Sequence, residues 1–128
     1  MRSRVLLVED SAPMREAVSR ILAVECDLVG YDGDGRHALK IAIDERPDVI
    51  VLDISLPGIS GMALLPLLRA AVPEVAVVML TNHVEEEYVE EAMRRGAHGY
   101  VLKSEVQEAL LPAVRLAGPP PIMPALPG

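Results

Sequence analysis

Three acidic residues follow directly on two short apolar runs of the sequence. Glu9 and Asp10 come after the run VLLV at 5–8, and Asp53 comes after the run VIVL at 49–52. A carboxylate at the end of a buried strand is costly unless something binds it. Carboxylates held close together also repel one another, which raises at least one pKa. A magnesium ion would relieve that repulsion, because Mg²⁺ prefers a few oxygen ligands and water, and so would a lysine.

A hydroxyl and an ammonium group follow two further apolar runs. Thr81 comes after VAVVML at 75–80, and Lys103 comes after GYVL at 99–102. If these runs are parallel strands, the two groups and the three carboxylates share the edge of the sheet where α/β proteins bind ligands. Such a set suits phosphoryl transfer. The metal and the ammonium neutralise phosphoryl oxygens, the hydroxyl donates a hydrogen bond, and one carboxylate attacks phosphorus.

Asp53 is the predicted nucleophile, because it stands alone at the tip of a central run. The pair Glu9 and Asp10 is better placed to bind the metal. The Pro-Gly pair at 57–58 suits a type II turn, which could leave the backbone carbonyl of Ser55 free as a further ligand. Each of these residues alone also has an ordinary structural use, such as a helix cap or a surface charge. The prediction therefore depends on the whole set.

The elements that must position these residues alternate along the chain. Apolar runs at 5–8, 28–31, 49–52, 75–80 and 99–102 are short and rich in β-branched residues, as buried strands are. Stretches of helical period separate the runs. This alternation predicts parallel strands with right-handed crossovers. The expected fold class is α/β, a doubly wound five-stranded parallel sheet between two layers of helices.

Several residues suggest where the helices begin. Pro13 suits the first turn of the first helix. Asn82 is a candidate N-cap of the fourth helix, and Ser104 with Gln107 would make a capping box for the fifth. In the fourth helix, the expected apolar face consists of Val84, Tyr88, Val89 and Ala92.

Composition limits the classes of function. The 128 residues are 51% hydrophobic and 24% charged, which suits one domain with a real core. A net charge of −7 argues against binding to nucleic acid or to an anionic membrane. Cys26 is the single cysteine, and no apolar run has the length of a signal-peptide core or a membrane span. We expect a cytoplasmic protein whose folded domain spans 1–117, with a Pro-rich, polyproline-like or disordered tail or linker at 118–128.

The motifs LLVED, VIVLDISLPGISG, VVMLT and GAHGYVLKS resemble the receiver domain of two-component response regulators, over residues 4–117. The segment around Lys103 is most similar to receivers attached to LuxR-type transcription factors. The resemblance implies a flavodoxin-like fold with strand order 2-1-3-4-5. It implies that Asp53 accepts a phosphoryl group from a sensor histidine kinase or a phosphotransfer protein. The result is a signalling switch in transcription regulation, not an enzyme beyond self-phosphorylation and slow autodephosphorylation.

The resemblance also assigns roles to other residues. Thr81 and Lys103 contact the phosphoryl oxygens, and Tyr100 matches an aromatic residue that changes rotamer with Thr81 on activation. The face formed by the fourth helix, the fifth strand and the fifth helix then meets an output partner or a second copy of the chain. The Mg²⁺ ligands that it implies are Glu9, Asp10, Asp53 and the backbone carbonyl of Ser55, with Asp10 favoured over Glu9 as a direct ligand.

Three residues depart from that pattern or from the expected helices. Ser104 follows the lysine where receivers often have a proline preceded by a cis peptide bond, so the geometry of that bond is open. Pro66 and Pro112 fall inside expected helices, which must therefore begin late or bend. Pro112 also alters the fifth helix, which puts the usual dimer in question.

Two other functions remain open. The motif GDGRHA at 33–38 matches a dinucleotide-binding pattern, although Asp32 and Asp34 would repel a pyrophosphate there. A receiver-like module that docks a partner without being phosphorylated is the other alternative. His83, close after Thr81, could shield or orient water at the phosphoryl site, or it could be a solvated residue of a helix's first turn.

Overall fold

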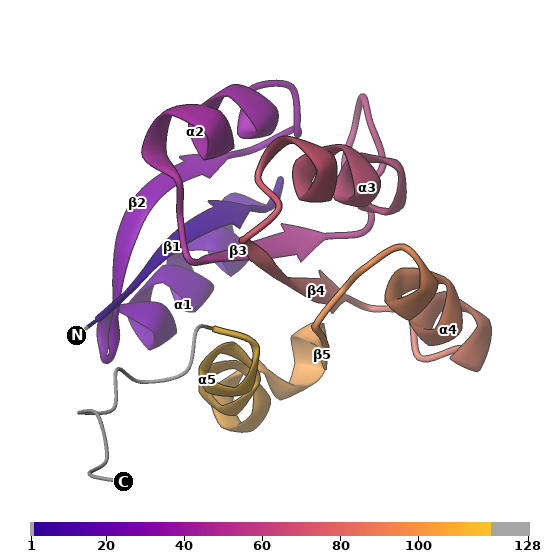
Figure 1. Cartoon of the computed structure of the whole chain (residues 1–128). Coiled ribbons are helices and arrows are strands. Elements are labelled where there is room, and N and C mark those ends of the chain that lie inside the picture. Colours follow the sequence, from indigo (N-terminus) through magenta and orange to yellow (C-terminus); the bar gives the residue numbers. More distant parts are fainter. Residues whose placement is uncertain (1, 119–128) are drawn as a thin grey trace, which may run out of the picture.

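Strands and helices alternate along residues 2–118, the part of the chain that the computed structural model describes (Figure 1). The expected alternation is therefore confirmed. The predicted tail lies outside the described residues except for Gly118. The strands are β1 (Ser3–Val8), β2 (Cys26–Asp32), β3 (Val49–Asp53), β4 (Ala76–Thr81) and β5 (Gly99–Leu102). The helices are α1 (Ala12–Ala23), α2 (Ala38–Glu45), α3 (Gly61–Ala71), α4 (Glu86–Arg94) and α5 (Val106–Ala117), with a 3₁₀ turn at Lys103–Glu105.

The strands form one parallel sheet in the predicted order β2-β1-β3-β4-β5. The central strand β3 is buried along its whole length, which explains its continuous apolar run. The register aligns the carboxyl ends of the inner strands: Val8 pairs with Leu52, and Asp53 pairs with Leu80. The residues that follow β1, β3 and β4 are thereby brought to one edge of the sheet.

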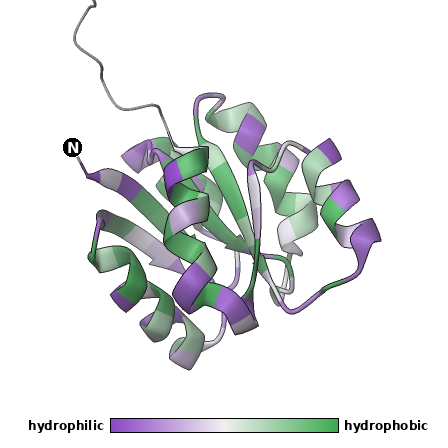
Figure 2. Cartoon of the chain, turned by 90° about the horizontal axis from the view of Figure 1, so that it is seen from below, coloured by the Kyte–Doolittle hydropathy of each residue, from purple (hydrophilic) through white to green (hydrophobic). Residues whose placement is uncertain are grey.

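A layer of helices covers each face of the sheet. α2, α3 and α4 pack on one face, where Leu52 of β3 belongs to the same buried cluster as Leu65 of α3. α1 and α5 pack on the other face, where Val51 is clustered with Leu22 and Leu110. Figure 2 shows the hydrophobic residues gathered along the strands and the hydrophilic ones toward the outer surfaces of the helices. Alternate residues of β3 therefore serve two separate cores.

Two of the predicted helix starts are wrong. α4 begins at Glu86, and Asn82 does not cap it. The chain instead makes a turn after β4 in which the backbone N–H of His83 donates to Thr81 Oγ1 at 3.0 Å, and the N-cap of α4, Glu85, makes no side-chain hydrogen bond. α5 begins at Val106, after the 3₁₀ turn, and its N-cap makes no side-chain hydrogen bond, so the Ser104 capping box does not form. Pro13 does lie in the first turn of α1.

Both questioned prolines lie inside their helices, so the option that these helices begin late is wrong. Pro66 has no N–H to donate to the carbonyl of Met62, one turn earlier in α3. That carbonyl instead accepts a hydrogen bond of 2.9 Å from Arg95 Nη1, just after α4. A side chain from the neighbouring helix thus supplies the donor that the proline lacks, and it ties α3 to the end of α4.

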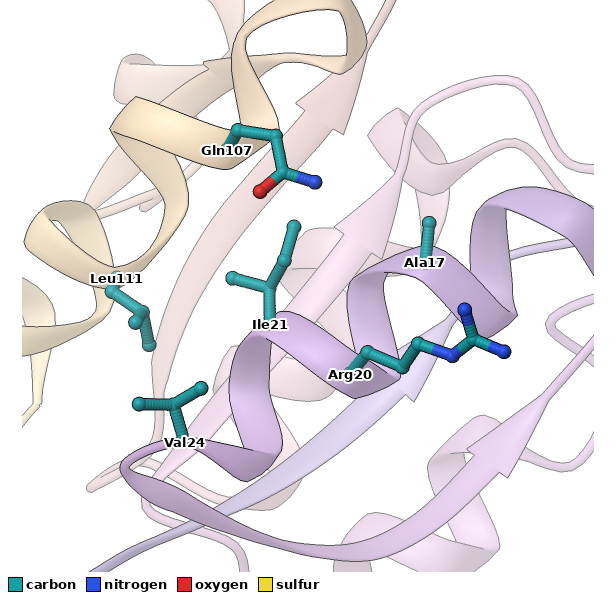
Figure 3. A pocket seen from close by; sticks show the side chains of 6 residues that line it. All are labelled: Ala17, Arg20, Ile21, Val24, Gln107 and Leu111. Carbon is teal, nitrogen blue, oxygen red and sulfur yellow. The ribbon is translucent and has the colours of Figure 1, made fainter.

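Within the described part of the chain, no helix combines the length and the apolar character needed to cross a membrane. A surface hollow of about 420 Å³ lies between α1 and α5, lined by Ala17, Arg20, Ile21, Val24, Gln107 and Leu111 (Figure 3). None of the residues predicted for phosphoryl transfer lines this hollow. The chemistry of interest must therefore be sought at the carboxyl edge of the sheet.

Candidate functional site

The structure brings the predicted residues together at that edge. Lys103, which follows β5, reaches across to the residues that follow β1 and β3. Its Nζ lies 2.9 Å from Glu9 Oε1 and 3.0 Å from Asp53 Oδ2. Glu9 is 0% exposed and Asp53 is 1% exposed, so this is a buried arrangement of one cation between two carboxylates. Removal of Lys103 would be strongly destabilising, because two buried carboxylates would be left without a compensating charge.

The electrostatics of this cluster favour an incoming cation. Burial raises the pKa of Asp53 to about 7, and the charge of Glu9 acts in the same direction, although hydrogen bonds from Lys103 and from the backbone N–H of Ser55 oppose it. Burial acts to lower the pKa of Lys103, but the hydrogen bonds and charges of Glu9 and Asp53 outweigh it and raise that pKa. The lysine therefore stays an ammonium, and one ammonium does not fully compensate the neighbouring acids.

The donor set fits a hard divalent cation. Oxygens of Glu9, Asp10 and Asp53 lie within 4.8 Å of one another, and Asp10 is exposed, so the cluster is open on that side. Glu9 Oε2 accepts a hydrogen bond of 2.9 Å from the backbone N–H of Ser11, while the buried Oε1 accepts no well-directed hydrogen bond. A cluster of three carboxylates that shares one ammonium is what Mg²⁺ can occupy while it keeps some of its waters.

Ser55 lies in the loop that leaves β3. Its backbone N–H donates to Asp53 Oδ1 at 2.9 Å and its side chain is exposed. Gly58 has a φ of 79°, the value that the second central residue of a type II turn requires, so the turn predicted from the Pro-Gly pair is supported. The use of the Ser55 carbonyl as a metal ligand stays a prediction.

Thr81 and Tyr100 are linked through the loop that leaves β4. Thr81 is 1% exposed, and its hydroxyl oxygen holds the backbone of His83. The half-buried Tyr100, on the neighbouring strand β5, donates from its hydroxyl to the carbonyl oxygen of His83 at 2.9 Å. A movement of Thr81 would therefore change the hydrogen bond of Tyr100, because the backbone of His83 contacts both side chains. No peptide bond between residues 2 and 118 is cis, so the Lys103–Ser104 bond is trans.

Sequence reasoning missed the contacts of two helical residues. The first is Tyr88, expected only as part of the apolar face of α4. The structure leaves Tyr88 38% exposed and Val84 71% exposed, so the predicted buried face is wrong for both, and Tyr88 stacks instead on His83. The second is Gly61, the first residue of α3, where a Cβ would lie 1.9 Å from the backbone oxygen of Asp53. Neither contact has a local signal in the sequence, since both join separate elements.

The dinucleotide alternative does not fit the loop after β2. That strand is an edge strand, and the loop's amides already have anionic partners. The backbone N–H of His37 donates to Asp32 Oδ2 at 2.8 Å, and that of Arg36 donates to Asp34 Oδ1 at 2.9 Å. A pyrophosphate would have to displace these carboxylates from the amides it needs. Asp32, Asp34 and His37 also bring ligand atoms within 4.8 Å of one another, apart from the residues predicted for the metal.

Comparison with known proteins identifies a family for this arrangement. A family model described as the response regulator receiver domain matches residues 5–115. The uncharacterized transcriptional regulatory protein YxjL of Bacillus subtilis is 36% identical over 116 residues, which make up 89% of this chain and 53% of the relative. The oxygen regulatory protein NreC of Staphylococcus haemolyticus is 35% identical over 115 residues, 88% of this chain and 53% of the relative. The chain thus spans about half the length of these curated relatives.

Solved structures of response regulators have the same fold. The response regulator domain of Thermotoga maritima CheB matches with a TM-score of 0.83 at 32% identity, covering 91% of this chain and 96% of that one. A LuxR-family two-component response regulator from Aurantimonas sp. SI85-9A1 matches with a TM-score of 0.84 at 27% identity, covering 89% and 83%. The implied strand order and the similarity to LuxR-type receivers are therefore confirmed.

Proposed function

The chain belongs to the response regulator receiver domain family, and we propose that it is a signalling switch that accepts a phosphoryl group on Asp53. The donor is a phosphohistidine of a sensor kinase or of a phosphotransfer protein. The observation that carries the proposal is the buried cluster in which Lys103 lies 3.0 Å from Asp53 and 2.9 Å from Glu9. One carboxylate is held beside an ammonium and beside other acids, which suits it to receive a phosphoryl group.

The transfer is a displacement at phosphorus. A carboxylate oxygen of Asp53 forms a bond to phosphorus, the nitrogen–phosphorus bond breaks, and the imidazole of the donor leaves. Lys103 and the hydroxyl of Thr81 then hold the phosphoryl oxygens and stabilise the negative charge that develops on them. Glu9, Asp10, Asp53 and the carbonyl of Ser55 would hold Mg²⁺, which supplies further neutralisation of the phosphoryl charge when bound. Water later hydrolyses the acyl phosphate, and the switch returns to its starting state.

The signal leaves the site through the loop after β4. When Thr81 moves toward the phosphoryl group, it pulls the backbone of His83 with it. Tyr100 is hydrogen-bonded to that backbone. Tyr100 turns inward, and the population shifts toward a state with a different α4–β5–α5 face. We propose that this face meets an output partner or a second copy of the chain. The named relatives are transcriptional and oxygen regulatory proteins, so transcription regulation is the proposed output.

Intact-protein mass after incubation with acetyl phosphate and Mg²⁺ tests the proposal. The wild type is expected to gain one phosphoryl mass, and chelation of the metal should prevent the gain. Asp53→Asn should gain none, whereas Asp34→Asn, an aspartate in the loop after β2, should react like the wild type. Modification of Asp53→Asn would disprove the nucleophile. No gain in the wild type would overturn the proposal in favour of a module that docks without phosphorylation.

Mg²⁺ should also stabilise the folded protein through the acidic cluster. A ligand that binds only the folded state adds about 1.4 kcal/mol to the free energy of unfolding at about ten times its dissociation constant. We expect added Mg²⁺ to raise the thermal midpoint of the wild type, and to raise that of Asp10→Asn much less. Asp10 is exposed, so this variant should fold. Asp34→Asn is the matched control from the second acidic group, and loss of the shift there instead would contradict the assignment.

A further inference from the structure

The backbone of Glu9 is held by groups from two other elements. Its N–H donates to the carbonyl oxygen of Asp32, the last residue of the neighbouring strand β2, at 3.0 Å. Its carbonyl oxygen accepts a hydrogen bond of 2.9 Å from Arg15 Nη1, near the start of α1. This carbonyl belongs to the peptide unit that joins Glu9 to Asp10. Arg15 therefore fixes the orientation of the backbone from which the side chain of Asp10 projects.

The guanidinium group of Arg15 is itself placed by β2 and by the loop that follows it. Its central carbon lies over the ring of Tyr31, 5.1 Å from the centroid, where a cation is attracted to an aromatic face. A Cβ on Gly33 would lie 3.4 Å from Arg15 Nη1, so the glycine leaves room for the guanidinium. Tyr31 is 61% exposed and belongs to neither buried cluster of the described residues. Its ring therefore supports the arginine rather than the core.

The contact that Arg15 makes separates two possible roles for its charge. Oxygens of Glu9, Asp10 and Asp53 lie within 4.8 Å of one another, and a positive charge close to them opposes the binding of a further cation. An arginine that served to balance these acids would be expected to contact a carboxylate, as Lys103 does. Arg15 instead donates to a backbone carbonyl. This contact indicates a role in orienting the backbone, at some electrostatic cost to metal binding.

Asp10 is the predicted metal ligand that depends most on this arrangement. Glu9 and Asp53 are buried and lie beside Lys103, so packing and ion pairs keep their carboxylates in place. Asp10 is exposed, and the direction of its side chain is set by the backbone that carries it. A rotation of the peptide unit before Asp10 would turn its carboxylate away from the other two.

We propose that Arg15 is a positioning residue of the predicted Mg²⁺ site, supported by Tyr31. It orients the peptide unit before Asp10, so that this carboxylate faces those of Glu9 and Asp53. The inference rests on the metal site of the proposed function and adds a residue that does not itself touch the ion. Loss of such an outer contact typically weakens metal binding by about 10- to 100-fold. Loss of the arginine's charge acts in the opposite direction, so we expect the lower end of that range.

The affinity of the protein for Mg²⁺ alone, measured from backbone amide NMR signals during a titration, tests this. Arg15→Met should bind Mg²⁺ about 10-fold more weakly than the wild type, although the substitution makes the protein more negative. Arg20→Met is the matched control, because it removes the same charge from an exposed position further along α1, at the hollow shown in Figure 3. Its Mg²⁺ affinity should equal that of the wild type or slightly exceed it.

Tyr31→Ala tests the same link while every charge is kept. Loss of a cation–π contact at an exposed site corresponds to about a 2- to 5-fold change in an equilibrium, so Mg²⁺ affinity should fall by that factor. Tyr31→Phe keeps an aromatic ring and should bind like the wild type. The double variant of Arg15→Met and Tyr31→Ala should bind no more weakly than Arg15→Met, because Tyr31 acts through the arginine. Tyr31 is exposed, so these variants at position 31 should fold.

Equal or tighter Mg²⁺ binding by Arg15→Met would overturn the inference, since the arginine would then act only on the fold or only through its charge. Urea unfolding in metal-free buffer measures any effect on the fold separately. If Arg15→Met does not fold, Tyr31→Ala decides, and unchanged binding there would overturn the inference.

The same titration distinguishes this inference from the proposed function. A wild type that binds no Mg²⁺ would disprove the metal site of the proposed function, and the role of Arg15 with it. A wild type that binds Mg²⁺ but accepts no phosphoryl group would disprove only the phosphoacceptor, and the affinities of the variants would still decide the role of Arg15.

Discussion

In the absence of metal, the stability of Asp53→Asn relative to the wild type is expected to rise by about 2 kcal/mol between about pH 5.5 and about pH 8.5. Burial raises the pKa of Asp53 in the folded state from 3.8 to about 7. Between these values the folded protein binds more protons at this position than the unfolded chain does. Stability from this group therefore falls as pH rises through that window, and it stays low above it.

The size of the effect follows from the same shift. Each unit of pKa difference corresponds to about 1.4 kcal/mol, so the full shift sets an upper bound of about 4 kcal/mol. Asparagine is uncharged at every pH and avoids this loss, and the pKa of about 7 already includes the opposing effect of Lys103. About half of the loss falls below pH 5.5, which leaves about 2 kcal/mol between the two pH values of the experiment.

Urea unfolding in metal-free buffer at about pH 5.5 and about pH 8.5 measures this difference. The control is Asp34→Asn, because a hydrogen bond from the backbone N–H of Arg36 lowers the pKa of Asp34, so no alkaline stabilisation is expected there. An equal difference between Asp53→Asn and the wild type at both pH values would show that Asp53 does not carry a raised pKa. Addition of Mg²⁺ should narrow the alkaline difference, because the metal favours the ionised carboxylate.

Gly61→Ala should destabilise the protein by about 3 kcal/mol or more, because the new Cβ has no space. Gly61 begins α3, and its N–H donates to the carbonyl of Ile54 at 2.8 Å. A Cβ would meet the backbone oxygen of Asp53 at 1.9 Å and its carbonyl carbon at 2.8 Å. Backbone atoms of a central strand cannot give way as a flexible side chain can. α3 would have to move away from the residue that carries the chemistry.

Gly58→Ala is the matched comparison for this prediction. Gly58 has a positive φ of 79°, but a Cβ there would meet its nearest atom, the backbone oxygen of Asp34, at 3.6 Å. Its cost comes from the left-handed backbone alone, which is about 1–2 kcal/mol. Urea unfolding of both variants separates steric overlap from backbone strain. Equal losses of stability in the two variants would show that α3 shifts easily. The close approach of Gly61 to Asp53 would then not be needed for stability.

The sequence by itself determined much of this protein because its signals are local. The strand–helix alternation and the apolar run before Asp53 can be predicted from the periodicity of apolar residues within a short stretch of sequence. Parallel strands then bring their carboxyl ends together, so Glu9, Asp53, Thr81 and Lys103 could be predicted to meet without coordinates. The same reasoning failed at Asn82 and Ser104, where a nearby capping residue did not decide where the helix begins.

Only the tertiary structure decided the contacts that join distant elements. The backbone of β3 excludes any side chain at Gly61, Arg95 supplies a donor to the carbonyl that Pro66 leaves without one, and Tyr88 stacks on His83. Each of these depends on the distance between two elements, which packing of the whole domain sets and which no run of neighbouring residues encodes. The raised pKa of Asp53 belongs with them, since it comes from burial of a carboxylate among groups that follow three separate strands.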